Sequence, residues 1–148
     1  MSFSVDQVDA DKNFIDFRHR NLRAGRSRST ALFPHDHAKG TYHFAARSEQ
    51  KIIGIVSYFN IQHDQLQDNL FSYQLRGMAV EKAYQQQKIG QSLLNSSMAS
   101  LQLKKAGLIW CNAREESWRF YQKNGFKTLG EFFLIPDVGQ HILMYKYI

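Results

Sequence analysis

The sequence predicts one α+β domain over residues 1–148, in which helices pack against a mixed β-sheet. Stretches with apolar residues at helical spacing alternate along the chain with short runs rich in β-branched and aromatic residues. A length of 148 residues, 43% of them hydrophobic, suits one domain with its own core. Only two prolines interrupt the chain, so most of it can form regular structure.

The first half of the chain predicts a helix, a hairpin of two strands and a third strand, at residues 9–23, 41–47, 51–59 and 71–80. The helix carries an apolar stripe of Ala10, Phe14 and Phe17 at helical spacing. The strands are rich in β-branched and aromatic residues. Polar stretches between these elements, which include residues 34–40 and 63–69, are predicted to be loops.

The second half alternates helices and strands. A helix that begins at Ile89 has its apolar residues on one face at a period near 3.6, and Gly107 is expected to cap its C-terminus. A wholly apolar strand, a second helix and two strands follow, at residues 108–111, 115–124, 131–135 and 141–147. The apolar strand is the pattern of a strand buried on both faces, and Gly125 is expected to end the second helix.

Charge and hydropathy limit the classes of function. The net charge of +6 and a pI of about 9.5 favour anionic partners such as nucleic acid, acidic lipid or a phosphorylated small molecule. The mean hydropathy of −0.46, the short apolar runs and an N-terminus without signal-peptide features argue against membrane insertion or export. A single cysteine, Cys111, excludes an internal disulfide and a zinc quartet. We therefore expect a cytoplasmic location and no membrane partner.

The most informative stretch, residues 78–94, runs from a strand through a loop into a helix. The start of a helix offers unpaired backbone N–H groups and a partial positive charge, which can hold a pyrophosphate. Gly90 lets a ligand approach the backbone, and Lys88 can add a charged contact. A polar loop that only caps an amphipathic helix remains the alternative interpretation.

A second stretch, residues 112–126, follows the buried strand and carries Tyr121 inside a predicted helix. A phenol at that point can donate a proton to a leaving group. The alternative is that Phe120 and Tyr121 are core aromatics, which is the more frequent role of such a pair.

Together these stretches resemble the GNAT superfamily of N-acetyltransferases. The acetyl-CoA loop of that family reads Gln/Arg-x-x-Gly-x-Gly/Ala, and residues 85–90 match its first and last positions, with Lys88 in place of the middle glycine. The second signature of the family, Phe/Leu-Tyr-x-x-x-Gly-Phe, is matched in full by residues 120–126. One amphipathic helix and one short strand separate the two, as in the family, and the resemblance covers residues 41–147.

The resemblance implies a three-layer α/β/α sandwich whose mixed, mostly antiparallel sheet has helices on both faces. It implies direct transfer of an acetyl group from acetyl-CoA, as cosubstrate, to a primary amine in a ternary complex. Acetyl-CoA would lie between the splayed strands 71–80 and 108–111, with backbone groups of Met78 and Val80 on the pantetheine and the thioester carbonyl. Tyr121 would give a proton to the departing thiolate. The implied cofactor contacts are Met78, Ala79, Val80, Gln85, Gln86, Gln87, Lys88, Ile89, Gly90, Gln91, Asn112, Arg114 and Ser117.

A general base must remove a proton from the attacking amine, because an alkyl amine is mostly protonated at neutral pH. His43, Glu131 and His141 are the candidates, and each has an alternative as an ordinary strand residue. We favour His141 as the second catalytic residue beside Tyr121, since an imidazole ordinarily titrates near pH 6.5.

Three further signals are weighed against simpler interpretations. The run His35-Asp36-His37 has no evident third metal ligand, so a loop is favoured and no metal site is expected. Cys111 ends an apolar strand, which favours a packed thiol over a nucleophile. The arginines of residues 18–28 could contact nucleic acid, an acidic acceptor or the phosphates of CoA, but solvated charge is their commonest role. They lack the interleaved aromatics of a single-strand binder, so we do not expect nucleic acid as a partner.

The sequence therefore predicts an acetyl-CoA-dependent N-acetyltransferase whose acceptor, a small-molecule or peptide amine, stays open. The alternative is a non-catalytic module on the same fold that binds CoA or nucleic acid. Tyr121 distinguishes the two, because a module that only binds has no need of a phenol there. The oligomeric state also stays open, with a homodimer among the options.

Overall fold

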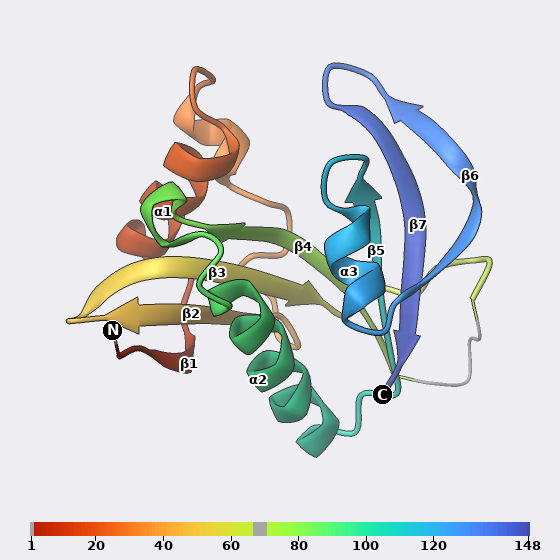
Figure 1. Cartoon of the computed structure of the whole chain (residues 1–148), viewed down its shortest axis with the longest axis horizontal. Coiled ribbons are helices and arrows are strands. Elements are labelled where there is room, and N and C mark those ends of the chain that lie inside the picture. The colour runs from red at the N-terminus through yellow and green to blue at the C-terminus, as the bar shows by residue number, and fades with distance from the viewer. Residues whose placement is uncertain (1, 67–70) are drawn as a thin grey trace.

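The computed structural model describes residues 2–66 and 71–148 (Figure 1). The elements in this part of the chain, in order, are β1 (Ser4–Val8), α1 (Lys12–Leu22), η1 (Arg28–Ala31), β2 (Tyr42–Ser48), β3 (Lys51–Phe59), β4 (Ser72–Val80), η2 (Lys82–Tyr84), α2 (Ile89–Leu103), β5 (Leu108–Arg114), α3 (Trp118–Lys123), β6 (Lys127–Ile135) and β7 (Gly139–Tyr147). No helix in this part is long and apolar enough to cross a membrane.

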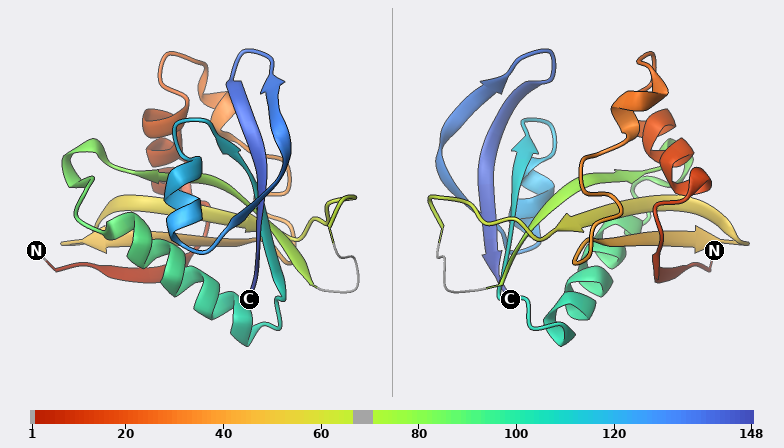
Figure 2. Two further views of the ribbon diagram at one scale, coloured as in Figure 1. Left: turned by 45° about the vertical axis from the view of Figure 1, so that its right-hand side comes forward. Right: turned by 180° about the vertical axis from the view of Figure 1, so that it is seen from behind.

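The strands form one seven-stranded sheet in the order β1-β2-β3-β4-β5-β7-β6. Every neighbouring pair is antiparallel except β4 and β5, which are parallel. Helix α1 covers one face with a core of its own, and α2 and α3 cover the other face over a second, larger core (Figure 2). The three-layer arrangement and the mixed, mostly antiparallel sheet are therefore confirmed.

Several boundaries differ from those that the sequence predicts. Strand β1 was not predicted, and α1 begins at Lys12, where the Asp11 side chain accepts a hydrogen bond from the Phe14 amide. Of the predicted loop 63–69, residues 67–69 lie outside the described residues. Strand β5 continues past residue 111 to residue 114, and α3 is shorter than the predicted helix 115–124.

The predicted cap at Gly107 is wrong. Helix α2 ends at Leu103, and Lys105 takes the left-handed conformation with a φ of 68°. The Ala106 amide then donates to the Leu101 carbonyl, which is the bond that closes such a helix end. The Gly107 amide donates instead to the Phe71 carbonyl, so Gly107 already belongs to the entry into β5.

Strands β4 and β5 diverge after a short contact (Figure 1). They pair only from Ser72 opposite Leu108 to Gln74 opposite Trp110. Beyond that point β4 stays paired with β3, and β5 stays paired with β7 as far as Arg114 opposite His141. The sheet is therefore open between the C-terminal halves of the two parallel strands, as the resemblance implies.

A β-bulge lies in the C-terminal half of β4, the half that is not paired with β5. The register passes from Ser57 opposite Arg76 to Ile55 opposite Ala79, so β4 holds one residue more than β3 over this step. Gly77 lies within the bulge at a φ of 64°, and a Cβ there would come within 3.0 Å of the Phe33 ring. Only glycine suits this position, and the bulge leaves backbone at the opening without its regular ladder partner.

Candidate active site

Three adjoining cavities form one groove along the opening between β4 and β5. The inner cavity, of about 370 Å³, lies between the two strands, and the central cavity, of about 670 Å³, lies beside β4 and α3. The loop cavity, of about 520 Å³, lies at the start of α2. Met78 and Tyr121 line both the inner and the central cavity, and Gly90 and Phe120 line both the central and the loop cavity. The groove therefore runs without a break from α2 to the gap in the sheet.

Most of the residues predicted from sequence line this groove. The inner cavity takes Met78, Asn112, Arg114, Ser117, Tyr121 and His141. The central cavity adds Ala79, Val80, Gln85 and Gly90, and the loop cavity adds Gln86, Lys88, Ile89 and Gln91. Gln87 lies outside the lining, and its side-chain amide donates to the Ala83 carbonyl at 3.4 Å.

The loop cavity holds the N-terminus of α2. Lys88 is the N-cap residue, and its side chain makes no capping hydrogen bond; the first turn carries no acidic residue. Helix α1 differs, since Asp11 caps it. The first N–H groups of α2 therefore have no side-chain acceptor, and with the helix dipole they form a site suited to a phosphate.

The backbone explains why the family places a glycine where this chain has Lys88. Gln86 and Lys88 both have a φ of 63°, in the left-handed region that glycine enters at least cost. Lys88 takes this conformation and keeps its side chain exposed at the rim. The Gln85 side chain closes the loop by donating to the Val80 carbonyl at 3.0 Å. The loop thus holds, at Lys88, the left-handed conformation that a glycine would enter at less cost.

Gly90 stands between the central and loop cavities. A Cβ there would lie 3.4 Å from the Phe120 ring and 3.7 Å from the Met78 methyl group. A larger side chain would press on both groups and fill the passage between the two cavities. The last glycine of the motif therefore keeps the groove continuous at this point.

Tyr121 combines the two roles that the sequence leaves open. Its ring belongs to the larger core and packs edge-on against Phe120 and Phe126, with centroid distances of 5.3 and 5.4 Å. Its hydroxyl lies at the groove and donates to Met78 Sδ at 3.8 Å. Burial raises the pKa of Tyr121 well above its ordinary value, so the phenol stays protonated across the physiological range.

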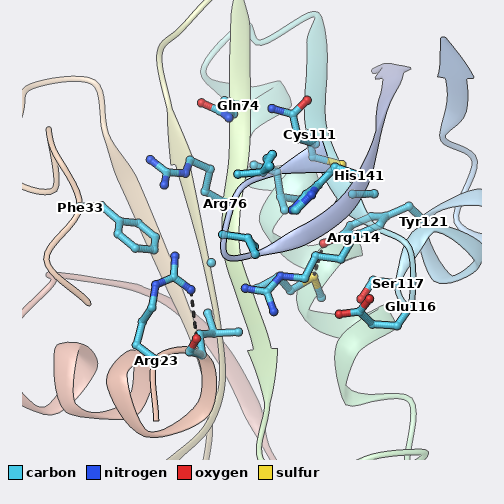
Figure 3. A pocket seen from close by; sticks show the side chains of 18 residues that line it. Arg23, Phe33, Gln74, Arg76, Cys111, Arg114, Glu116, Ser117, Tyr121 and His141 are labelled. Atoms are coloured by element: carbon cyan, nitrogen blue, oxygen red, sulfur yellow. Dashed lines mark hydrogen bonds between the residues drawn. The ribbon is translucent and has the colours of Figure 1, made fainter. Parts of the chain in front are cut away.

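His141 lies at the inner cavity on β7, opposite Arg114 of β5 (Figure 3). Its Nδ1 is 2.8 Å from the Gly139 carbonyl, and because a carbonyl only accepts, Nδ1 carries the proton. Phe133 stacks on the ring at a centroid distance of 6.0 Å. Nε2 therefore bears a lone pair, and within the described residues it has no hydrogen-bond partner.

The other two candidate bases lie away from the groove. His43 is buried beside α1, with Nδ1 2.7 Å from Ser57 Oγ and Nε2 2.8 Å from the Asp36 carbonyl. Both nitrogens are engaged, and burial lowers the pKa of His43. Glu131 is exposed on β6 and lines none of the three cavities.

The arginines of residues 18–28 have different environments. Arg18 is fully buried rather than solvated, and its guanidinium binds Asp36 through two hydrogen bonds of 2.7 and 3.1 Å. The exposed Arg20 and Arg28 pair with Glu81 and Asp16, and Arg26 donates to the Asp137 carbonyl. Arg23, which caps α1, is the member of the group that lines the inner cavity.

Burial and pairing describe two further positions that the sequence singles out. Asp36 is occupied by Arg18, and no group of three metal-ligating side chains occurs among residues 2–66 and 71–148. Cys111 is a buried free thiol whose pKa is raised by burial, so it is the packed thiol that its apolar strand predicts.

Sequence reasoning missed several residues of the inner cavity. Arg76 precedes the recognised motif on β4, and Phe33 comes from the loop after η1. Ile135 ends β6, and Val138 lies in the turn between β6 and β7. No spacing in the sequence joins these positions, since tertiary packing alone brings them together.

Residues 39–128 match the family model of the acetyltransferase (GNAT) domain. An uncharacterized N-acetyltransferase of Bacillus subtilis (strain 168), YitI, is 38% identical over 131 residues, which make up 88% of this chain and 87% of that protein. Among solved structures, Ard1 from Thermoplasma volcanium superposes with a TM-score of 0.78 at 13% identity, over 100% of this chain and 99% of that one. An aminoglycoside 6'-N-acetyltransferase complexed with coenzyme A gives a TM-score of 0.74 at 16% identity, over 97% and 96%. At these identities the two structures are similar to this chain in fold.

Proposed function

Because the chain belongs to the GNAT family of acetyltransferases, we propose that residues 1–148 act as one N-acetyltransferase domain that transfers the acetyl group of acetyl-CoA to a primary amine. One observation carries the proposal: a single groove connects an uncapped helix N-terminus with a protonated phenol and an imidazole lone pair. The coenzyme A complex of a similar fold supports the choice of cosubstrate.

The groove fits the parts of acetyl-CoA in order. The N–H groups at the start of α2 and the Lys88 ammonium suit the pyrophosphate. The central cavity, bordered by Met78, Ala79 and Val80, suits the pantetheine arm. The backbone of the β4 bulge comes next along the groove and suits the thioester, because a backbone N–H there would stabilise negative charge on the carbonyl oxygen.

Acetyl-CoA supplies an activated thioester, and the side chains handle two protons. His141 Nε2 accepts a proton from the amine as the new C–N bond forms. Tyr121 gives a proton to the sulfur as the C–S bond breaks, and the proton held by His141 restores the phenol through solvent. The products are an amide and the free CoA thiol. Holding both reactants in one groove supplies a further part of the rate enhancement.

Two measurements test this function together. Thermal denaturation with millimolar acetyl-CoA should raise the midpoint, because a ligand that binds only the native state stabilises it. Incubation with amines and acetyl-CoA should release CoA thiol. Absence of a thermal shift contradicts the choice of cosubstrate. A shift without thiol release from a broad amine panel would instead favour the non-catalytic binding module.

A further inference from the structure

The inner cavity is lined by three arginines from separate parts of the fold. Arg23 is the C-cap residue of α1, Arg76 lies on β4 beside the bulge, and Arg114 ends β5. In Figure 3 the guanidinium groups of Arg23 and Arg76 lie on the same side of β4 as Phe33, and the Arg114 side chain extends toward β4 from the side of His141. Glu116 is the one acidic side chain in the lining of this cavity as far as the structure describes it. The cavity therefore carries a net positive charge.

These three guanidinium groups form no ion pair with any described residue. Asp36, Glu81, Asp16 and Asp6 pair with other arginines of the chain. Among the described residues, the one hydrogen bond of the Arg23 side chain goes to the adjacent Leu22 carbonyl at 3.0 Å. Arg76 is half-buried and its contacts are with aromatic rings, which do not neutralise a charge.

The Phe33 ring holds the arginines in place. The Arg76 guanidinium carbon lies 4.4 Å from its centroid and that of Arg23 lies 5.4 Å from it. Arg18, which Asp36 neutralises, lies at 3.9 Å. A ring face attracts cations and fixes their positions, so Phe33 acts as a platform on which Arg23 and Arg76 are presented to the cavity.

The arrangement is costly without an anion. Burial lowers the pKa of Arg23, and the nearby charges of Arg114 and Arg76 lower it further. Burial and the charge of Arg18 lower the pKa of Arg76, and the carboxylate of Asp36 offsets only part of this effect. Like charges gathered in a half-buried cavity repel one another, and a bound anion removes that repulsion.

The anion in question is distinct from the phosphates of the cosubstrate. Those fit the loop cavity, at the start of α2, and the central cavity separates it from the inner one. The inner cavity instead contains His141 and the Tyr121 hydroxyl, so it is the place for the acceptor.

We propose that the acceptor is a small amine that also carries an anionic oxyacid group, a carboxylate or a phosphate, bound by Arg23, Arg76 and Arg114. This inference rests on the proposed function and names its substrate class. Planar guanidinium groups bind such oxygens through paired hydrogen bonds. The anchored group turns the amine toward His141 Nε2. Cationic amines such as polyamines are repelled by the same charges.

Matched amines test the charge requirement. CoA thiol release is measured with β-alanine against β-alaninamide, with O-phosphoethanolamine against ethanolamine, and with spermidine. The anionic member of at least one pair should have a kcat/KM at least tenfold above its neutral partner, and spermidine should be the poorest. The first pair reports on a carboxylate and the second on a phosphate. Equal rates within both pairs, or preference for spermidine, would overturn the inference.

Variants locate the anion. The double variant Arg23→Gln/Arg76→Gln should raise the KM of the preferred anionic amine at least tenfold and leave the Kd of acetyl-CoA within twofold. Arg28→Gln is the matched control, because Arg28 pairs with Asp16 and lines none of the three cavities. An unchanged KM in the double variant, or an equal rise in the control, contradicts the assignment.

A binding measurement keeps the inference separable from the proposed function. With CoA present, N-acetyl-β-alanine or N-acetyl-O-phosphoethanolamine should raise the thermal midpoint of the wild type, and the neutral N-acetyl-β-alaninamide should not. The shift should disappear in the double variant. If acetyl-CoA binds but neither anion shifts the midpoint, the anionic acceptor is wrong and the cosubstrate stands. If acetyl-CoA itself does not bind, the proposed function fails first.

Discussion

The Tyr121 hydroxyl donates to Met78 Sδ over 3.8 Å, which joins α3 to the bulge of β4. A thioether sulfur is a weak acceptor, so this contact is readily exchanged for a better one. The donor is also fixed, because two aromatic rings hold the Tyr121 ring in the core. A neutral donor in a rigid position, paired with a replaceable acceptor, is what a leaving sulfur atom requires.

Tyr121→Phe should lower kcat by about 10²-fold, since a positioned proton donor contributes about 10² to 10⁴ to a rate. The Kd of acetyl-CoA should stay within threefold, because the phenol takes no part in holding the phosphates. Steady-state kinetics and a binding isotherm measure the two quantities.

Tyr58→Phe is the control for Tyr121→Phe. The buried hydroxyl of Tyr58 is 2.6 Å from Ser97 Oγ. Tyr58 belongs to the same core as Tyr121 but lines none of the three cavities. This variant should lose about 1 kcal/mol of unfolding free energy and keep its kcat. If both variants keep full activity, Tyr121 is not the acid.

His141→Asn should remove the base and keep the local structure. The Asn amide can still donate to the Gly139 carbonyl in place of Nδ1, while the Nε2 lone pair is lost. We expect kcat/KM to fall by about 10²-fold near neutral pH. A kcat/KM within threefold of the wild type would assign proton removal to solvent.

Lys88→Gly should leave the Kd of acetyl-CoA within tenfold of the wild type, because one exposed charge contributes up to about 1 kcal/mol. Glycine adopts the left-handed conformation of residue 88 at less cost than lysine does, so the free energy of unfolding should not fall. Lys105→Gly is matched in residue type and in φ, but lies at the far end of α2. A larger loss of affinity confined to Lys88→Gly would make its ammonium a principal phosphate ligand.

His43 should make stability depend on pH. Burial holds its pKa below the ordinary 6.5 that the unfolded chain retains, so the unfolded state takes up the proton first as pH falls. Its contribution is complete above pH 6.5 and is lost as pH drops toward the lowered folded value. The urea midpoint should therefore be lower at pH 5.5 than at pH 7.5, and the difference should shrink in His43→Gln. In the control His19→Gln the difference between the two urea midpoints should stay as in the wild type. If it also stays unchanged in His43→Gln, then His43 is not the source of the pH dependence.

The sequence predicts an element well where the residues of that element alone determine its structure. Strand β3 has the predicted bounds because its β-branched run is unambiguous, and Gly125 ends α3 as expected at a φ of 93°. Strand β1 was missed because it is short and largely polar, and only its pairing with β2 makes it a strand. The two motif stretches were predicted to line a cofactor site because each is one contiguous run of residues that can be identified from sequence alone. Arg23 and Arg76 were not predicted to meet, since Phe33 joins them across the fold.

The walls of the inner cavity have a consequence for how such a protein can diversify. The family match spans residues 39–128, whereas Arg23 and Phe33 precede it and Ile135, Val138 and His141 follow it. The ends of the chain thus furnish much of the surface that we propose for the acceptor, while the loop cavity and α2 lie inside the matched span. Exchange of the two flanking segments between relatives would be a direct route to a new acceptor preference on an unaltered donor site.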